Sequence, residues 1–156
     1  MEKNIHFSNM TEKKLKNIFI NGAVTAQFIA GEIQKHSAKT NIGAHEIFLG
    51  QVRADVINDK VVSAIEYTTY EAMALEKMHE IREAIFEKYE LVCMHVYHSL
   101  GIVKAGEISL FVFTSSAHRR TAIDAGNEVV ERLKNELPVW GKEIFDNEMY
   151  QWKVNS

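Results

Sequence analysis

The 156-residue chain has little of several residue types, and each shortage excludes a class of protein. Its one cysteine, Cys93, cannot form a disulfide within the chain, and a single cysteine suits a reducing compartment. Its one proline and 46% hydrophobic content argue against a disordered chain. No apolar run reaches the ~18 residues that a membrane-spanning helix needs, and residues 1–17 lack the apolar core of a signal peptide. We therefore expect a globular cytoplasmic protein without membrane contact.

Positive charge is also in short supply. Lysine and arginine number 18 against 21 aspartate and glutamate residues, which gives a formal net charge of -3. A protein that binds nucleic acid non-specifically usually has a broadly basic surface, so we expect no nucleic-acid partner. Any anion site must therefore be a local concentration of cationic side chains.

Hydrophobic periodicity predicts an α+β protein. Residues 1–16 are polar and lysine-rich and predict an N-terminal arm, whereas 17–156 predict a single domain. Apolar residues at helical spacing predict three helices, over 24–36, 71–89 and 118–136. Apolar runs between turn residues predict seven strands, over 17–20, 44–53, 61–70, 91–98, 107–113, 140–145 and 149–155. This order lacks the strict alternation of α/β proteins.

Local signals add detail to the predicted strands. Gly50 lies inside a strand, where glycine often marks a bulge. The pair Asn58-Asp59 predicts a loop over 56–60, and 100–106 predicts a turn that joins two antiparallel strands.

The chain lacks the usual signatures of metal, nucleophile and nucleotide sites. His95 and His98 lie three apart in a predicted strand and would point to opposite faces, and the seven histidines include no HExxH. There is no GxSxG, and Cys93 lies in an apolar strand, where it favours a buried hydrophobe. Neither GxxxxGK[ST] nor GxGxxG occurs. We therefore expect no metal, no cofactor and no nucleophile.

One short stretch, SSAHRR at 115–120, concentrates cations where a helix should begin. Ser115 or Ser116 would serve as the N-cap. His118 and Arg119 then fall in the first turn, where the macrodipole disfavours a cation by about 0.3–1 kcal/mol. A bound anion would reverse that cost, because helix N-terminal N–H groups and an arginine both complement a phosphate or carboxylate. The alternative is that these cations are merely solvated surface charges.

Further cations lie at the ends of other predicted elements, at Arg53, Lys134 and Lys142. Lys134 lies sixteen residues beyond His118, which is about 24 Å along a helix. One chain cannot bring both to a single small ligand. The spacing therefore predicts either a site shared across a two-fold interface or two separate sites.

An ordered set of short motifs gives the chain a family resemblance. The set comprises GQVR (50–53), HSLG (98–101), GE (106–107), SSAHRR (115–120), LK (133–134) and PVWGKE (138–143). Together these fragments resemble the large, catalytic subunit of molybdopterin synthase. The resemblance implies an α/β-hammerhead fold with a mixed or antiparallel sheet, and a homodimer flanked by two copies of a small ubiquitin-like subunit. The C-terminal Gly-Gly thiocarboxylate of that partner would supply sulfur to cyclic pyranopterin monophosphate, which makes molybdopterin.

The resemblance also implies roles for individual residues. The substrate-binding set would be Gln51, Val52, Arg53, His118, Arg119, Lys134, Gly141, Lys142 and Glu143, and the catalytic set would be Lys134, Lys142 and Arg53. Two positions depart from the family pattern, because Gly141 stands where the family commonly has lysine and Ser99 where it often has arginine. In a regular strand Lys142 would face away from position 141. The alternative function is a non-catalytic module that binds a ubiquitin-like tail or a phosphate ligand.

Overall fold

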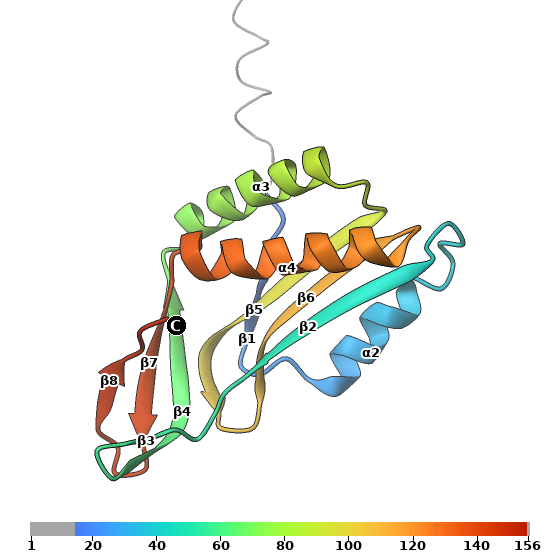
Figure 1. Cartoon of the computed structure of the whole chain (residues 1–156). Coiled ribbons are helices and arrows are strands. Elements are labelled where there is room, and N and C mark those ends of the chain that lie inside the picture. Colours follow the sequence, from blue (N-terminus) through green and yellow to red (C-terminus); the bar gives the residue numbers. More distant parts are fainter. Residues whose placement is uncertain (1–14, 156) are drawn as a thin grey trace, which may run out of the picture.

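A computed structural model describes residues 15–155 of the chain, so the predicted arm over 1–16 falls almost wholly outside the described residues. The described part contains three helices and eight strands (Figure 1). In chain order they are β1 (Phe19–Asn21), α2 (Ala26–Lys35), β2 (Ala44–Gln51), β3 (Val56–Ile57), β4 (Lys60–Thr69), α3 (Glu71–Lys88), β5 (Cys93–Lys104), β6 (Ile108–Ser116), α4 (Arg119–Glu136), β7 (Val139–Phe145) and β8 (Tyr150–Trp152). The predicted α+β class with three helices is confirmed.

The strands form one mixed sheet in the order β2-β6-β5-β4-β7-β8. Strand β1 pairs in parallel with β5, and β3 pairs with β4. Helices α3 and α4 cover one face, and α2 packs on the other (Figure 1). None of the helices within 15–155 is both long and apolar enough to cross a membrane.

Strand β6 lies between these two helical layers. Its alternate residues Leu110 and Val112 face α3 and α4, whereas Phe111 and Phe113 face α2. Residues two apart in a strand share a face, so a strand covered on both sides must be apolar at nearly every position. This explains the unbroken run ISLFVF, which is buried from Ser109 onward.

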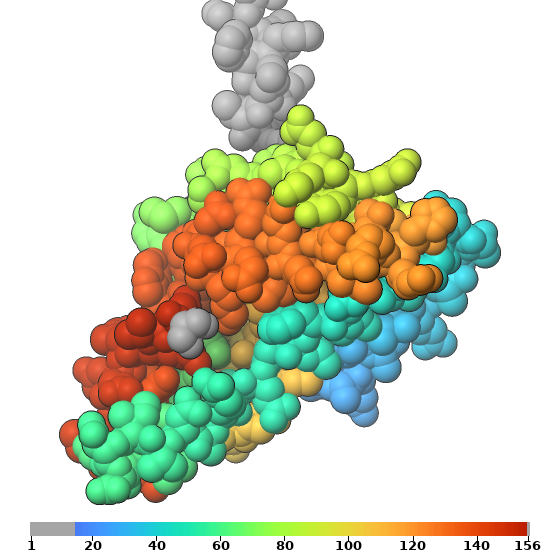
Figure 2. Space-filling view, in the orientation of Figure 1, coloured from blue at the N-terminus to red at the C-terminus, as the bar shows by residue number. Residues whose placement is uncertain are grey.

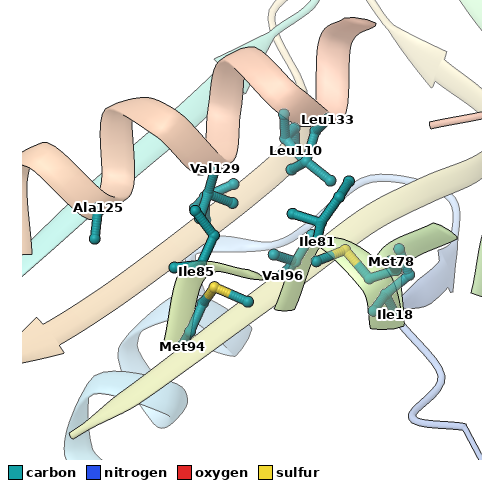
Figure 3. Close-up of a cluster of buried hydrophobic side chains, with 11 residues drawn as sticks. Ile18, Met78, Ile81, Ile85, Met94, Val96, Leu110, Ala125, Val129 and Leu133 are labelled. Carbon is teal, nitrogen blue, oxygen red and sulfur yellow. The ribbon is translucent and has the colours of Figure 1, made fainter. Parts of the chain in front are cut away.

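The main core lies between the sheet and the pair α3 and α4 (Figure 3). Helix α3 contributes Ile81 and Ile85 at a four-residue spacing, and α4 contributes Val129 and Leu133 at the same spacing. Such spacing places the side chains on one face of a helix. Met78 of α3 is buried in the same core.

Strand β5 differs from its prediction, because the expected turn over 100–106 is wrong for most of that range. The strand continues to Lys104. It pairs with β6 as far as His98 and then with β4 from Gly101 onward. Gly101 has a φ of +80°, a left-handed conformation that favours glycine, and it lies where the strand passes from one partner to the other. The predicted antiparallel pairing of β5 with β6 is confirmed.

The start of α4 also differs from its prediction. Ser115 and Ser116 are buried inside β6 rather than capping the helix, and His118 is the N-cap. The Ser115 hydroxyl lies 2.6 Å from Nδ1 of His45, and the Ser116 hydroxyl donates to the Glu90 carbonyl at 3.0 Å. Both hydroxyls are therefore committed to contacts made by the strand. The predicted bulge is confirmed between Gly50 and Gln51.

We expect Ile85→Ala to lower the free energy of unfolding by about 2–5 kcal/mol, because Ile85 is fully buried in the main core. Ile33→Ala is the matched control, since Ile33 on α2 is 40% exposed. Urea unfolding of both variants checks the prediction. Equal losses in the two variants would contradict the assigned core.

Candidate functional site

A solvent-open pocket lies where the β2–β6–β5 and β4–β7–β8 halves of the sheet meet the end of α4. Its cavity volume is about 80 Å³. Figure 2 shows this face, on which α4 in orange, the C-terminal segment in red and β2 in teal surround a hollow. The residues that line it include five with polar or ionisable side chains that bear on its chemistry: Gln51, Tyr67, His98, Lys134 and Lys153. The pocket thus joins segments that lie up to about a hundred residues apart in the sequence.

Lys134 lies in the last turn of α4, where a cation is favoured by the helix macrodipole. The residue as a whole is exposed, and it lines the pocket. Desolvation at the pocket lowers the pKa of Lys134, and the positive charge of Lys153 lowers it further. A lysine of lowered pKa gives up its proton more readily than a free lysine, and as an ammonium it stabilises negative charge.

His98 forms the buried floor of the pocket. Its Nδ1 lies 2.8 Å from the backbone carbonyl of Ser99, and a carbonyl only accepts, so Nδ1 carries the proton. Burial lowers the pKa of His98 to about 4, and the charge of Lys134 contributes in the same direction. The ring is therefore neutral near neutral pH. Ser99 itself is fully buried and presents no charge to the pocket.

Tyr67 lines the same floor from β4. Its ring packs edge-on to His98 with the centroids 5.1 Å apart, and its hydroxyl donates to the Ser109 hydroxyl at 3.2 Å. Burial raises the pKa of Tyr67, so the phenol stays protonated. Sequence reasoning assigned no role to Tyr67, Ser109 or Lys153. His98 belongs to the HSLG motif, which was the one available signal for this part of the site.

The register of β7 decides which residues at 141–143 reach the pocket. Gly141 pairs with Tyr67, Lys142 with Glu66, and Glu143 with Ile65. Regular alternation places Gly141 and Glu143 on one face and Lys142 on the other. The backbone at Gly141 is closely packed, since a Cβ there would lie 3.0 Å from Cγ2 of Ile65.

Lys142 consequently points away from the pocket. Its ammonium lies 3.1 Å from Oε1 of Glu66 and 4.6 Å from the centre of the Tyr150 ring. The buried Glu143 accepts a hydrogen bond from Gln151 at 2.9 Å. The structure therefore separates Lys142 from Lys134, although both were expected in one catalytic set.

Lys153 occupies the place across from Gly141. The backbone N–H of Lys153 donates to the Gly141 carbonyl at 2.8 Å, directly after the β8 pair of Lys142 with Trp152. Cross-strand neighbours share a face of a sheet. Lys153 accordingly lines the pocket beside a residue that has no side chain of its own.

The last residue of β2 and the two residues that follow it face different surroundings. Gln51 lines the pocket, whereas Val52 is buried and bonds through its backbone to Gly106 and Glu107. Arg53 is exposed and its Nε lies 3.3 Å from Oδ1 of Asp55. Of the predicted set, Gln51, Lys134 and Gly141 therefore share one pocket.

His118 and Arg119 lie at the opposite end of α4 from Lys134. Both are exposed, and His118 adjoins a separate surface pocket with Asn41, Glu90 and Thr121. The helix between them is continuous, so the separation of about 24 Å that follows from its rise per residue holds within one chain.

The architecture defines a class, namely an α+β protein with a lysine-lined pocket at the junction of two sheet halves. Residues 23–136 match the model of the MoaE protein family. That match covers well over half of the chain. The chain therefore belongs to the MoaE protein family, in agreement with the resemblance found in its motifs.

Relatives with similar sequences carry the name of molybdopterin synthase catalytic subunit. A molybdopterin synthase catalytic subunit of Drosophila grimshawi is 34% identical over 85% of this chain and 37% of its own length. The protein of that name from Aspergillus niger is 36% identical over 74% of this chain and 63% of its own length. The chain thus spans between about a third and two thirds of these relatives.

Solved structures share the fold. The crystal structure of molybdopterin synthase from Staphylococcus aureus superposes with a TM-score of 0.76 at 25% identity, covering 87% of this chain and 95% of that one. A complex of subunits 1 and 2 of molybdopterin-converting factor from Helicobacter pylori gives 0.73 at 22% identity, covering 86% and 87%.

The low pKa of His98 predicts a pH-dependent stability. Between its ordinary pKa of 6.5 and about 4, the unfolded chain binds a proton at this residue and the folded chain does not. The stability that His98 contributes is therefore present above pH 6.5 and is lost as the pH falls toward 4. We expect the difference in unfolding free energy between the wild type and His98→Gln to shrink over that range, as measured by urea unfolding. A constant difference would contradict a depressed pKa.

The electrostatic influence of Lys153 on Lys134 predicts that removing Lys153 changes the pKa of Lys134. We expect Lys153→Met to raise the pKa of Lys134 toward its ordinary value, because it deletes a neighbouring positive charge. NMR titration of the lysine Cε signals, assigned with Lys134→Arg, measures the shift. Lys142→Met is the matched control and should leave the Lys134 titration unchanged, since Lys142 pairs with Glu66 on the other face.

Proposed function

We propose that this chain is a sulfurtransferase, the catalytic subunit of a molybdopterin synthase. It would move sulfur from the C-terminal thiocarboxylate of a small ubiquitin-like subunit to cyclic pyranopterin monophosphate. The observation that carries the proposal is the solvent-open pocket in which Lys134 and Lys153 converge over His98 and Tyr67. Membership of the MoaE protein family supports it.

The lining of the pocket suits a reaction in which the partner carries the nucleophile. In each transfer the thiocarboxylate sulfur would form a carbon–sulfur bond to a side-chain carbon of the pterin while a carbon–oxygen bond of that carbon breaks and the oxygen leaves. Water would then add to the acyl carbon and cleave its bond to sulfur, which releases the partner as a carboxylate and leaves the sulfur on the pterin. Negative charge is present on the thiocarboxylate and develops on the substrate oxygens. Lysine ammonium groups in a partly desolvated pocket stabilise such charge more strongly than they would in water.

Lys134 is the residue to which we assign the central role. Its lowered pKa lets it hold the thiocarboxylate as an ammonium and release a proton to a departing oxygen. The neutral His98 below it offers an unprotonated Nε2, because Nδ1 donates to the Ser99 carbonyl. That nitrogen would accept a hydrogen bond from the substrate.

Lys153 is assigned the role that a lysine at position 141 would have. Gly141 has no side chain, and Lys153 reaches the same face of the sheet from the adjacent strand end. Gln51 and the Gly141 backbone would contact the substrate, and the buried Glu143 would position Gln151. Val52 would act through the backbone that shapes the end of β2.

The phosphate of the substrate is assigned to His118 and Arg119 of a second protomer, with Arg53 at the rim. The length of α4 prevents Lys134 of the same chain from meeting His118. A two-fold homodimer would pair one end of α4 with the other end in the partner. Two small subunits would complete a heterotetramer. The complex of subunits 1 and 2 of molybdopterin-converting factor from Helicobacter pylori, which shares this fold, supports a second subunit as partner.

Single-turnover assays test these roles, with a thiocarboxylated small subunit and the cyclic pterin precursor. We expect Lys134→Ala to lower the rate of dithiolene formation by about 10²–10⁴-fold, the range for loss of an acid–base group. Lys153→Ala should lower it by at least ~10-fold, whereas the control Lys142→Ala should change it by less than ~3-fold. A larger loss in Lys142→Ala than in Lys153→Ala would contradict the assignment.

The non-catalytic alternative makes a different prediction in the same assay. A binding module would form a stable complex with the small subunit and yield no dithiolene at full occupancy. Product formation by the wild-type chain excludes it.

A further inference from the structure

A second cluster of reactive side chains lies on the other side of the sheet. His36 follows α2 as its C-cap, and Cys93 and His95 open β5. Cys93 and His95 are two apart in a strand and share a face, which is the face that α2 covers. The three ligand atoms, one from each side chain, all lie within 4.8 Å of one another.

The protonation of His36 can be assigned from its hydrogen bonds. Its Nδ1 lies 2.6 Å from the Glu32 backbone carbonyl, which only accepts, so Nδ1 carries the proton. The Nε2 lone pair then points toward His95, whose Nε2 is 3.0 Å away. A histidine that donates Nδ1–H to a backbone carbonyl and presents a free Nε2 has the arrangement that is usual for metal-binding histidines.

A hydrogen bond from Lys16 to Nδ1 of His95 favours the neutral form of the His95 ring. The Lys16 ammonium lies 3.0 Å from Nδ1 of His95 and donates to it, which leaves Nε2–H to donate to His36. The ring is therefore an uncharged donor of the kind that metals bind.

We propose that His36, Cys93 and His95 form a zinc site, with a fourth position open to water or another ligand. Two imidazoles and a thiolate are a ligand set that Zn²⁺ prefers. Tetrahedral zinc requires separations of about 3.3 Å between two nitrogens and about 3.6 Å between nitrogen and sulfur. The two Nε2 atoms lie 3.0 Å apart, and no two ligand atoms of the cluster are more than 4.8 Å apart. Small side-chain rotations would bring these separations to the values that zinc requires.

Binding would release one proton and relocate another. The Cys93 thiol loses its proton to solvent as the sulfur–zinc bond forms. The His95 proton moves from Nε2 to Nδ1, so the exposed Lys16 gives up its hydrogen bond there. The thiolate and the carboxylate of the buried Glu32 offset the positive charges of Lys16 and Arg82 around the cluster.

This site is separate from the lysine pocket. His95 faces α2, whereas His98, three residues later on β5, faces α4 and the pocket. Zinc would tie α2 to β5 and so stabilise the folded chain. The inference therefore stands or falls independently of the proposed sulfur transfer, and it reverses the expectation of no metal.

Cobalt titration of the full, reduced chain tests the site. We expect one Co²⁺ per chain, a sulfur-to-cobalt charge-transfer band in the near ultraviolet and intense tetrahedral ligand-field bands, all displaced by Zn²⁺. Cys93→Ser should abolish the charge-transfer band, and His36→Gln and His95→Gln should each weaken binding at least ~10-fold. Each variant is first checked for native circular dichroism.

His79→Gln is the matched control, because His79 is a partly exposed histidine on α3 outside the cluster. It should bind Co²⁺ as the wild type does. Zn²⁺ should also raise the melting temperature of the wild type and of His79→Gln but not of Cys93→Ser. Absence of the charge-transfer band in the wild type, or its survival in Cys93→Ser, would overturn the proposal.

Discussion

The burial of β5 and β6 between two helical layers is the constraint on which the rest of the structure depends. Because both faces of β6 are covered, its side chains alternate between the α3–α4 core and the α2 layer. Strand β5 follows the same alternation, so Met94, Val96 and His98 face one layer while Cys93 and His95 face the other. One strand therefore supplies both the floor of the lysine pocket and two members of the proposed zinc site.

The transfer of β5 from β6 to β4 at Gly101 then creates the pocket itself. The two halves of the sheet diverge there, and the end of α4 and the residues after β8 close the gap. Lys134 and Lys153 thus line the same partly desolvated pocket, where burial and the positive charge of Lys153 lower the pKa of Lys134. A pair of like charges in such a place is costly unless an anion binds, which is why the pocket suits an anionic ligand.

Much of the fold could be predicted from the sequence, because helices and strands leave periodic patterns of apolar residues. The three helices and the pairing of β5 with β6 followed from those patterns. The length of β5 did not follow from them. Glycine often marks the end of a strand, but at Gly101 the strand continues and changes its partner from β6 to β4. Ser115 and Ser116 were misassigned as caps because a hydroxyl suits a helix start and a buried strand equally well, and their partners His45 and Glu90 are distant in sequence.

The sequence by itself determined the α+β class, the family, and the fact that one helix is too long for His118 and Lys134 to share a ligand within a chain. These follow from local periodicity, ordered motifs and the fixed rise of a helix. Only the tertiary structure decided that Lys142 faces Glu66 while Lys153 lies over Gly141, and that His36 meets Cys93 and His95. Strand register and the docking of α2 set those contacts, and both depend on packing between segments far apart in the chain, which a linear pattern does not record.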